Sequence, residues 1–502
     1  MAQGGPAQSG LAVQSSIGAA LDEAPTGRFH RRVVLVSGAG FFTDAYDLFV
    51  ISTVALLATT QWHLSTTETS WVTGAAILGA FVGAFVFGRI ADVLGRKRVY
   101  VLVAVIMIIG ALASALSPNW IFLVVARFVL GLGIGGDYPV SAVLMSEYSN
   151  RKDRGRLVGM VFSMQAVGLI VGPLVALLLI GSGVGNQLTW RLLLGLGAIP
   201  AAAVVYMRTL IPESPRFRSH VEGATEAAAS ELGSFTGIEV AEVEGSDPRR
   251  PLMTIRKFFQ DRRMLVLVLG TAGTWLLFDY AYYGNTLSLP AILKEVSPHA
   301  SLTVKLIWTL ALFVVFALPG YLLAFLKMDR IGHKRLQLIG FSVMTLAFAT
   351  LGAFERLTTM VVPFLLVFGL SYFFVQFGPN MTTFVLPSEV FPVNMRTTGH
   401  GIAAGMGKFG AFLGVFLVPA LQETIGLRGM LLVAAGAAVG GFLLTLPLPE
   451  PSQRSLEELA DPGSDALSTV AQLAPIEMPL AAEPLAAEPL AAAGPLAVAE
   501  PR

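Results

Sequence analysis

The sequence contains no cysteine, which excludes disulfide bonds, thiolate metal sites and cysteine nucleophiles. Charged residues are also scarce: they make up 13% of the chain, against about 25% in a typical soluble domain. The formal net charge of +1 gives no electrostatic reason to expect nucleic-acid binding. None of the six histidines pairs with another at metal-ligand spacing, and no phosphate-binding loop of the Walker type is present. A membrane enzyme and an ATP-driven pump are therefore disfavoured, and no cofactor is expected.

Apolar residues are abundant instead: 54% of the chain is hydrophobic and the mean hydropathy is +0.69. A chain of this length can keep so much apolar surface exposed only in a bilayer. Transmembrane strands would be about half as long as the apolar runs and would alternate in polarity, so the fold class is predicted to be all-α integral membrane. Twelve runs are near or above the roughly 20 residues that a spanning helix needs. They lie at about 33–58, 71–91, 99–117, 121–147, 157–181, 190–211, 264–290, 302–326, 336–353, 360–387, 398–421 and 428–447.

The basic residues are distributed unequally between the two sides of these spans. Most of the 34 Lys and Arg residues fall in the N-terminal segment, in the even-numbered loops and after the last span. Because cytoplasmic loops are rich in Lys and Arg, both termini are expected in the cytoplasm. These anchors indicate a multi-pass plasma-membrane protein, and the Ala/Gly-rich, cysteine-free composition indicates a bacterial inner membrane. The sequence leaves the oligomeric state open.

Composition divides the chain into five parts. Residues 1–32 are expected to form a cytoplasmic N-terminal segment, and 33–211 and 263–447 two halves of six helices each. The polar stretch 212–262 carries charges of both signs and predicts a cytoplasmic linker with short amphipathic pieces. Between 448 and 502 the near-repeat PLAAEPLAAEPLAAAGPLAVAEP places proline every few residues, which predicts a disordered cytoplasmic tail.

A short motif recurs in the two halves. Gly88–Arg98 reads GRIADVLGRKR and Asp329–Arg335 reads DRIGHKR, so both contain Asp-x-(Leu/Ile)-Gly-x-Lys-Arg just after an apolar run. Repeated halves place a substrate site between them near the middle of the bilayer, and the halves rock around that site. The repeat therefore predicts two pseudo-symmetric six-helix halves.

The repeated loop motif resembles the signature of the major facilitator superfamily, and this resemblance implies the fold of that superfamily. The PESPR segment at 212–216 and the PSE segment at 387–389 are similar to motifs of its sugar-porter-like branch. In that family such charges close the cytoplasmic side through ion pairs that break on opening. The alternative is that Arg96–Arg98 serve only as topology anchors. The residues that we assign to gating are Asp92, Arg96, Arg127, Glu147, Asp329, Glu389 and Arg396.

Ionisable residues lie inside several predicted spans, where each costs about 2.5–3.5 kcal/mol to insert. Such residues are functional candidates by default, and here acids and one lysine recur at similar depth in both halves. They are Asp44, Asp47, Arg127, Asp137, Asp279 and Lys408.

One span carries a polar face. Trp275, Asp279 and Tyr283 follow at intervals of four, which places an indole N–H, a carboxyl and a phenol on one side of a helix. This pattern indicates the lining of a cavity, because an acid that faces lipid is costly. The alternative is a lipid-facing aromatic stripe with a satisfied acid. Gln165 and Asn380 are weaker candidates, since a buried amide often serves only as an interhelical hydrogen bond.

A more specific resemblance rests on several segments. GDYP at 136–139 with SEY at 146–148, FGPN at 377–380 and GHG at 399–401 are similar to motifs of the phosphate:proton symporter family, which includes fungal and plant phosphate transporters. The likeness runs from about residue 30 to 447. It implies that phosphate contacts Tyr138, Gln165, Trp275, Asp279, Tyr283 and Asn380. It also implies proton coupling, which we assign to Asp44, Asp47, Asp137, Asp279 and Lys408.

These side chains suit a protonated oxyanion. Uncharged donors bind phosphate yet permit its release, whereas an arginine clamp would hold it too tightly for turnover. Asp279 either accepts a hydrogen bond from protonated phosphate or is itself protonated while phosphate is bound. The sequence thus predicts a secondary active symporter that imports inorganic phosphate with protons by alternating access. Two alternatives stay open: a sugar or organic-acid symporter of the same superfamily, and a membrane nutrient sensor.

Overall fold

The computed structural model describes residues 17–236 and 252–460, and all regular elements within these ranges are helices. Eleven helices are long and apolar enough to cross a membrane. The last of them, α22 (Arg396–Thr445), is two helices joined at Gly426, which has φ 70° and ψ 174°. A positive φ is open to glycine without steric cost, so the chain turns there and begins another span. The prediction of twelve transmembrane helices is therefore confirmed.

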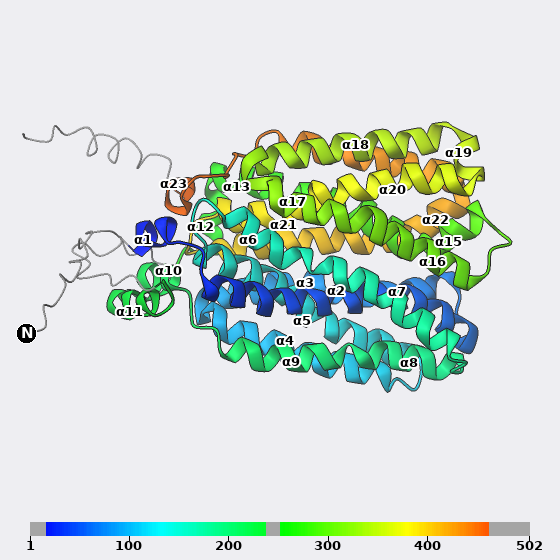
Figure 1. The fold of residues 1–502 in the computed structure, drawn as a ribbon, viewed down its shortest axis with the longest axis horizontal. Helices are drawn as coiled ribbons and strands as arrows, with labels where there is room; N and C mark the ends of the chain where they lie inside the picture. The colour runs from blue at the N-terminus through cyan, green and yellow to red at the C-terminus, as the bar shows by residue number, and fades with distance from the viewer. Residues whose placement is uncertain (1–16, 237–251, 461–502) are drawn as a thin grey trace, which may run out of the picture. The chain divides into compact units, whose positions relative to one another are not determined.

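The first half begins with four long helices and ends with two broken ones (Figure 1). Its helices are α2 (Arg28–Trp62), α3 (Thr66–Leu94), α4 (Arg96–Ala115), α5 (Trp120–Tyr148), α6 (Arg154–Ser163) with α7 (Gln165–Gly181), and α8 (Asn186–Leu196) with α9 (Ala198–Thr209). Side-chain caps explain two of the starts, since Ser65 accepts from the Glu68 N–H and Asn119 from the Phe122 N–H.

The second half repeats this arrangement with more interruptions. Its helices are α13 (Arg262–Val268) continuing into α14 (Thr274–Leu287), α15 (Leu289–Val296), α16 (Leu302–Leu312) continuing into α17 (Leu318–Ile331), α18 (His333–Ala353), α19 (Glu355–Thr359), α20 (Val361–Phe377) with α21 (Pro379–Val390), and α22. The break between α20 and α21 falls at Gly378, and Pro379 follows it without an N–H to donate.

Several short helices lie at one end of the bundle, which we call the linker end; the opposite end, where α15 and α19 lie, is the far end (Figure 1). They are α1 (Ile17–Glu23), α10 (Pro215–Phe217), α11 (Thr225–Thr236), α12 (Ile255–Gln260) and α23 (Leu456–Ala460). Residues 448–460 differ from the expected disordered tail, because Leu456 and Leu459 are buried and α23 is helical. The rest of that predicted tail, and residues 237–251 of the linker, lie outside the described residues.

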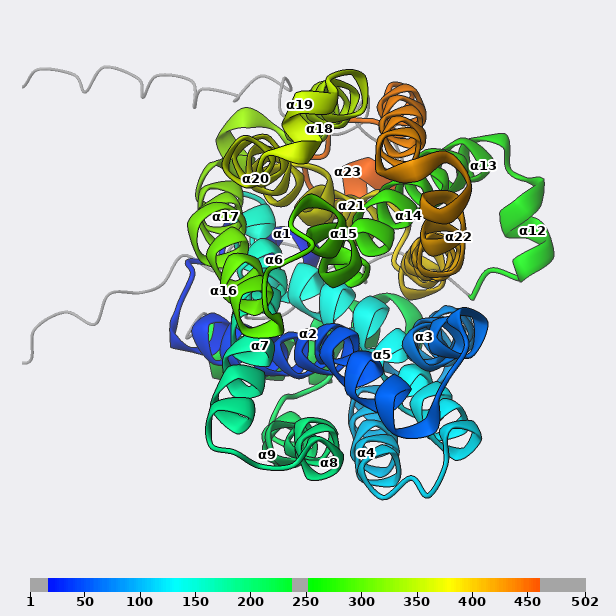
Figure 2. The same cartoon turned by 90° about the vertical axis from the view of Figure 1, so that its right-hand side faces the viewer.

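The two halves lie side by side when the bundle is viewed from the far end (Figure 2). Within each half, glycines bring helix backbones into contact. A side chain at Gly135 of α5 would collide with the Ala80 carbonyl of α3, and one at Gly410 of α22 would collide with the Leu276 carbonyl of α14. Close packing through glycine thus occurs in both halves, at different helix pairs.

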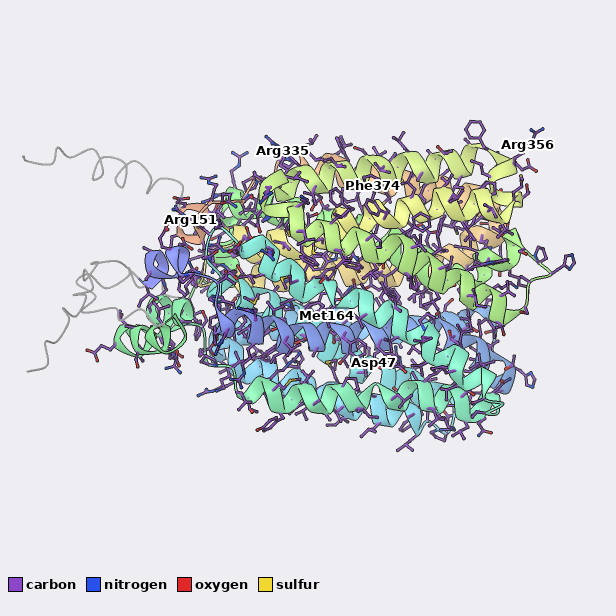
Figure 3. All side chains as sticks on the ribbon, viewed as in Figure 1. Asp47, Arg151, Met164, Arg335, Arg356 and Phe374 are labelled. Atoms are coloured by element: carbon purple, nitrogen blue, oxygen red, sulfur yellow. The ribbon has the colours of Figure 1, made fainter. Side chains whose placement is uncertain are left out.

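Charge and apolarity are segregated along the bundle. Figure 3 shows Arg151 and Arg335 toward the linker end and Arg356 at the far end, whereas Asp47 lies within its length. On the outer faces between these ends, Ile109, Leu178 and Leu346 are 57%, 65% and 66% exposed. Apolar side chains this exposed match a protein whose sides face lipid.

Candidate functional site

Helix α14 presents three of the predicted binding residues to the centre of the bundle. Trp275, Asp279 and Tyr283 are each 1% exposed. Lys408 reaches them from α22, with its Nζ 3.1 Å from Asp279 Oδ2 and 3.0 Å from the Tyr283 hydroxyl, to which it donates. The lysine thus lies within hydrogen-bonding distance of the carboxylate and the phenol predicted from the four-residue spacing.

The first half contributes to the same cluster. The Lys408 ammonium lies 4.5 Å from the centre of the Tyr138 ring on α5 and 4.3 Å from that of Tyr283. The Tyr138 hydroxyl accepts from Gln165 Nε2 of α7 at 3.4 Å, and Gln165 Oε1 accepts from Asn380 Nδ2 of α21 at 3.2 Å. The structure therefore brings all six predicted binding residues and Lys408 together. We call this set the central cluster: Tyr138, Gln165, Trp275, Asp279, Tyr283, Asn380 and Lys408.

Sequence reasoning missed two polar members of the surrounding network. The Tyr321 hydroxyl of α17 donates to Gln165 Oε1 at 2.5 Å and accepts from Asn380 Nδ2 at 2.7 Å. Gln376 accepts another hydrogen bond from Asn380 and donates to the Tyr282 hydroxyl at 3.1 Å. The position of Gln376 four residues before Asn380 was a usable signal, whereas nothing in the sequence marks Tyr321.

A second pair of buried charges lies apart from this cluster. Arg127 Nη2 donates to the backbone oxygen of Asp47 at 2.6 Å, and neither carboxylate oxygen of Asp47 has a hydrogen-bond partner among the described residues. We predicted a gating role for Arg127 together with Glu147. The two are twenty positions apart on α5, which is about 30 Å along a helix. The structure therefore places Arg127 away from the linker-end charges, beside Asp47.

Asp137 has a charged partner near the end of the last span of the first half. Arg208 is buried in α9 with its Nη2 2.6 Å from Asp137 Oδ1. Ser141 also donates to Asp137 Oδ1 at 3.1 Å. Asp44 lies within reach of Asp137 and Arg208. The predicted coupling acids thus fall into three places rather than one.

Three predicted gating residues of the first half, Asp92, Arg96 and Glu147, form a buried ion-pair network at the linker end. Arg96 Nη2 lies 3.1 Å from Asp92 Oδ1 and 3.1 Å from Glu147 Oε1. Arg396, at the start of α22, lies 3.3 Å from the same Glu147 oxygen. Asp92 also accepts from the backbone N–H of Thr398 at 2.7 Å. A carboxylate of one half therefore caps a helix of the other half, which ties the halves together at this end.

The second half has a matching network with a histidine at the place of Arg96. His333 lies 3.4 Å from Asp329 and 3.6 Å from Glu389. Asp329 Oδ2 also accepts from the Arg156 N–H of the first half at 2.7 Å. Backbone caps repeat too, because Glu450 accepts from the His333 N–H at 2.8 Å as Glu213 accepts from the Arg96 N–H at 3.2 Å. The internal repeat therefore extends beyond the loop motif.

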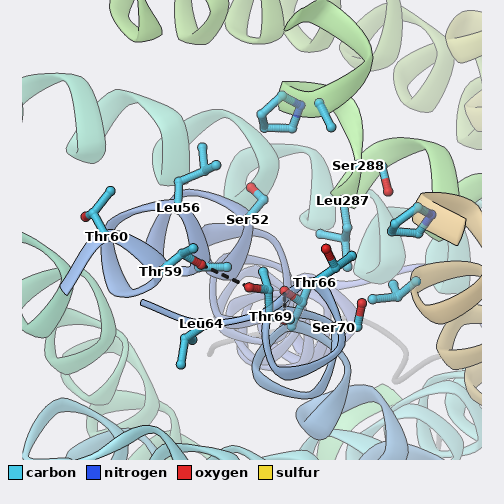
Figure 4. A pocket seen from close by; sticks show the side chains of 16 residues that line it. Ser52, Leu56, Thr59, Thr60, Leu64, Thr66, Thr69, Ser70, Leu287 and Ser288 are labelled. Carbon is cyan, nitrogen blue, oxygen red and sulfur yellow. Dashed lines mark hydrogen bonds between the residues drawn. The ribbon is translucent and has the colours of Figure 1, made fainter. Parts of the chain in front are cut away.

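A pocket of about 410 Å³ opens near the far end, between the two halves (Figure 4). Its polar groups are hydroxyls, including those of Ser52, Thr59, Thr69 and Ser288, and Thr59 and Thr69 are 3.0 Å apart. Toward the centre, the Phe49 ring of α2 stacks on Tyr283 with ring centres 5.3 Å apart. The linker end is closed by buried ion pairs, and this pocket lies between the halves on the far side of the central cluster.

Comparison with known proteins agrees with this architecture. Residues 33–461 match the family of sugar (and other) transporters. The chain is 36% identical to a probable inorganic phosphate transporter 1-6 of Arabidopsis thaliana, over 89% of this chain and 96% of that protein. It is 35% identical to the low affinity inorganic phosphate transporter 4 of Petunia hybrida, over 90% and 95% of the two chains. Among solved structures, the major facilitator superfamily proton:xylose symporter XylE bound to 6-bromo-6-deoxy-D-glucose matches with a TM-score of 0.73, 21% identity and coverage of 88% and 99%. At that identity the likeness shows the fold.

Proposed function

Because the chain belongs to the sugar (and other) transporter family of the major facilitator superfamily, we propose that it is a secondary active transporter that imports inorganic phosphate together with protons. The relatives described above are named as phosphate transporters, and this chain matches nearly their whole length. Two of the motifs that resemble the phosphate:proton symporter family, GDYP at 136–139 and FGPN at 377–380, contribute Tyr138 and Asn380 to the central cluster.

The observation that carries the proposal is the composition of the central cluster. It offers uncharged donors from Tyr138, Trp275 and Gln165 around one ammonium group, and no arginine. Neutral donors and a single cation can bind a phosphate monoanion and still release it. Asp279 adds an acceptor, which a protonated oxyanion satisfies with its own O–H group.

Coupling follows from the contact between Asp279 and Lys408. The two charges lie 3.1 Å apart and neutralise each other. An arriving anion competes with the carboxylate for the ammonium, so protonation of Asp279 favours phosphate binding and loss of that proton favours release. Each ligand then binds best to the state that the other produces, which is the thermodynamic requirement for symport. The proton gradient is the proposed energy source, without a cofactor.

Alternating access would act through the linker-end network. Opening that end requires the Arg96–Glu147 and Arg396–Glu147 pairs to separate, together with the Asp92 cap on α22. We place the protein in a plasma membrane with both termini and the linker end in the cytoplasm, on the distribution of basic residues. The comparisons lend no support to a bacterial inner membrane, since the relatives that they describe are plant proteins.

The test of substrate is a competition assay with the purified protein in liposomes. Radiolabelled phosphate uptake is measured with an excess of unlabelled phosphate, arsenate, sulfate, xylose or a small carboxylic acid. The proposal expects inhibition by phosphate and arsenate and none by sugar. Absence of phosphate uptake, together with uptake of labelled xylose or of a labelled carboxylic acid in the same liposomes, would instead support the alternative symporter of the same superfamily, whose fold the xylose symporter shares.

A further inference from the structure

A short helix precedes the first span of the second half and lies at the edge of the bundle. Helix α12 is separated from α13 by Asp261, whose backbone is extended with φ −80° and ψ 115°. The Asp261 carboxylate caps α13, since its Oδ1 accepts from the Arg263 N–H at 2.8 Å. Figure 2 shows α12 beside α13 and outside the long helices. The chain therefore turns at Asp261 before the span begins.

One side of α12 is fixed against the protein. Phe258 is buried, and its ring centre lies 5.9 Å from that of Phe391. Phe391 belongs to the segment that leads into α22, and its backbone oxygen accepts from Arg396 Nε at 3.0 Å. Thr254 caps α12 by accepting from the Lys257 N–H at 3.3 Å. The second half thus holds the helix in one orientation, and the outer face of α12 is already formed.

This outer face is apolar and exposed. Ile255 and Phe259 are four positions apart, so they share a face of the helix, and they are 47% and 42% exposed. The span that follows also exposes apolar side chains, at Val266 and Leu269. Apolar side chains exposed on a span contact acyl chains. The apolar face of α12 therefore lies next to a lipid-facing part of the bundle, at the level where a span begins.

Basic side chains accompany the apolar face. Residues 252–263 contain four basic residues and one acid. Arg256, Lys257 and Arg262 are exposed, and none of them forms an ion pair with a carboxylate within the ranges 17–236 and 252–460. Long basic side chains lay their apolar stems along a hydrophobic surface and keep the charge at the headgroup layer. An apolar face with basic residues beside it is typical of helices that lie on anionic membranes.

The size of the apolar face favours lipid over a protein partner. Ile255 and Phe259 expose only part of two side chains, whereas a stable protein interface buries more than about 1,000 Å². Lipid is already in contact with the adjoining span, so it reaches this face without any further component. The charge of the neighbouring arginines selects among lipids, because a phosphate that carries a net negative charge complements them.

We propose that α12 binds anionic phospholipid of the leaflet at the linker end, with Ile255 and Phe259 against the acyl chains and Arg256 and Arg262 against the headgroup phosphates. This lipid site lies outside the bundle and is separate from the central cluster. It attaches the second half to one leaflet beside α13, whereas the transported ion is bound between the halves.

The experiment places a fluorescent label at Gln260→Cys, an exposed position at the end of α12, since the chain has no other cysteine. The full-length protein is placed in phosphatidylcholine liposomes. A spin-labelled lipid that quenches the fluorophore is then added in increasing amounts, either as phosphatidylglycerol or as phosphatidylcholine. We expect half-maximal quenching at a content of the anionic lipid that is about fivefold or more lower, because each basic residue near anionic lipid contributes roughly this factor.

Two double variants locate the site. Arg256→Gln/Arg262→Gln should make the two quenching curves coincide. Arg31→Gln/Arg32→Gln is the matched control, because it removes two exposed arginines from the start of α2, and it should leave the preference for the anionic lipid unchanged. Equal loss of the preference in both double variants would overturn the assignment to α12.

Ionic strength tests the same point in the protein that carries only the label. Sodium chloride at high concentration should remove the preference for the anionic lipid, while the apolar contact still permits quenching by both lipids. Inorganic phosphate at equal ionic strength should have no additional effect. Equal quenching by both lipids at low salt, or quenching by neither, would overturn the proposal. Displacement of the anionic lipid by inorganic phosphate would assign the arginines to a soluble anion and would also overturn it. Because the measurement does not involve transport, its failure would leave the proposed function untouched.

Discussion

The Lys408 ammonium on α22 and the Asp279 carboxylate on α14 lie 3.1 Å apart, and both side chains are almost fully buried. Their contact neutralises two charges that would each be costly at this depth. It also means that the cation available to an anion is already engaged. Under the proposed function, we expect binding of phosphate and the ionisation of Asp279 to be coupled, which leads to the first prediction.

Replacing Asp279 with asparagine removes the group that competes for Lys408 and can take up a proton. We expect Asp279→Asn to abolish the pH dependence of phosphate uptake between about pH 5 and pH 8, and to lower proton-driven uptake about tenfold or more. The measurement is the initial rate of labelled phosphate uptake at a series of external pH values. Glu295→Gln, which makes the same chemical change at an exposed far-end acid, is the matched control and should behave like the unaltered protein. A normal pH profile in Asp279→Asn would refute its role.

Glu147 joins two arginines that begin helices in different halves. Loss of one partner from a buried ion-pair network costs about 3–5 kcal/mol, which changes a ratio of conformations by more than about tenfold. We expect Glu147→Gln to favour opening of the linker end, because Arg96 and Arg396 lose their shared carboxylate.

Cysteine labelling can measure this shift directly, since the chain has no cysteine of its own. Ser388→Cys reports on the linker end and Ser288→Cys on the far-end pocket. In Glu147→Gln, labelling by an impermeant maleimide should increase severalfold at the first position and decrease at the second. The exposed acid Glu423 provides a control in Glu423→Gln. If labelling at each of the two positions is the same with and without Glu147→Gln, a gating role for Glu147 is excluded.

The segment that follows the last span is attached by Glu457. Burial acts to raise the pKa of Glu457, but Arg216, whose Nε lies 3.1 Å away, and neighbouring cations lower it to about 2. A depressed pKa means that the carboxylate stabilises the attachment above its ordinary pKa of 4.5, and that this contribution is lost as the pH falls toward 2. A fluorescent label at Ala460→Cys should therefore report no release of α23 between about pH 5 and pH 8.

Glu457→Gln should release the same label at neutral pH, since the interaction with Arg216 is then uncharged. Release in this variant shows that the label detects detachment of α23. Absence of release in the unaltered protein would then assign the pH dependence of transport to groups inside the bundle rather than to α23. Release of the label between pH 8 and pH 5 in the unaltered protein, in step with the change in uptake, would show the opposite.

Glycine at the α3–α5 contact is predicted to be essential for packing. A methyl group at Gly135 would collide with the Ala80 carbonyl, whereas one at Gly436 would meet no atom within 4 Å. We expect Gly135→Ala to lower stability by about 1–3 kcal/mol and Gly436→Ala to be neutral or stabilising. The thermal unfolding midpoint of the detergent-solubilised protein measures both. Equal midpoints would show that the helices can separate without cost.

Much of the central cluster could be predicted because membrane burial makes polar residues informative. Asp279 and Lys408 are conspicuous in apolar runs, and the spacing of Trp275, Asp279 and Tyr283 places them on one face. The twelve spans could be counted for the same reason, and the turn at Gly426 falls between the last two predicted runs.

The partners of these residues could not be predicted, since they depend on contacts between helices distant in the chain. Arg208 lies in the last turn of a span, where an arginine usually serves as a topology anchor, and its partner Asp137 is on another helix. Arg127 was assigned to gating, but its depth in α5 places it beside Asp47. Tyr321 carries no local pattern and is recognised only through Gln165 and Asn380.

The most direct test of the account is labelled phosphate uptake into liposomes that contain the purified protein, with an inward proton gradient and with or without an uncoupler. The account predicts accumulation of phosphate above its external concentration, prevented by the uncoupler and strongly reduced in Lys408→Ala. Phosphate uptake that is unchanged by the uncoupler would contradict it. Sugar transport without any phosphate uptake would also contradict it.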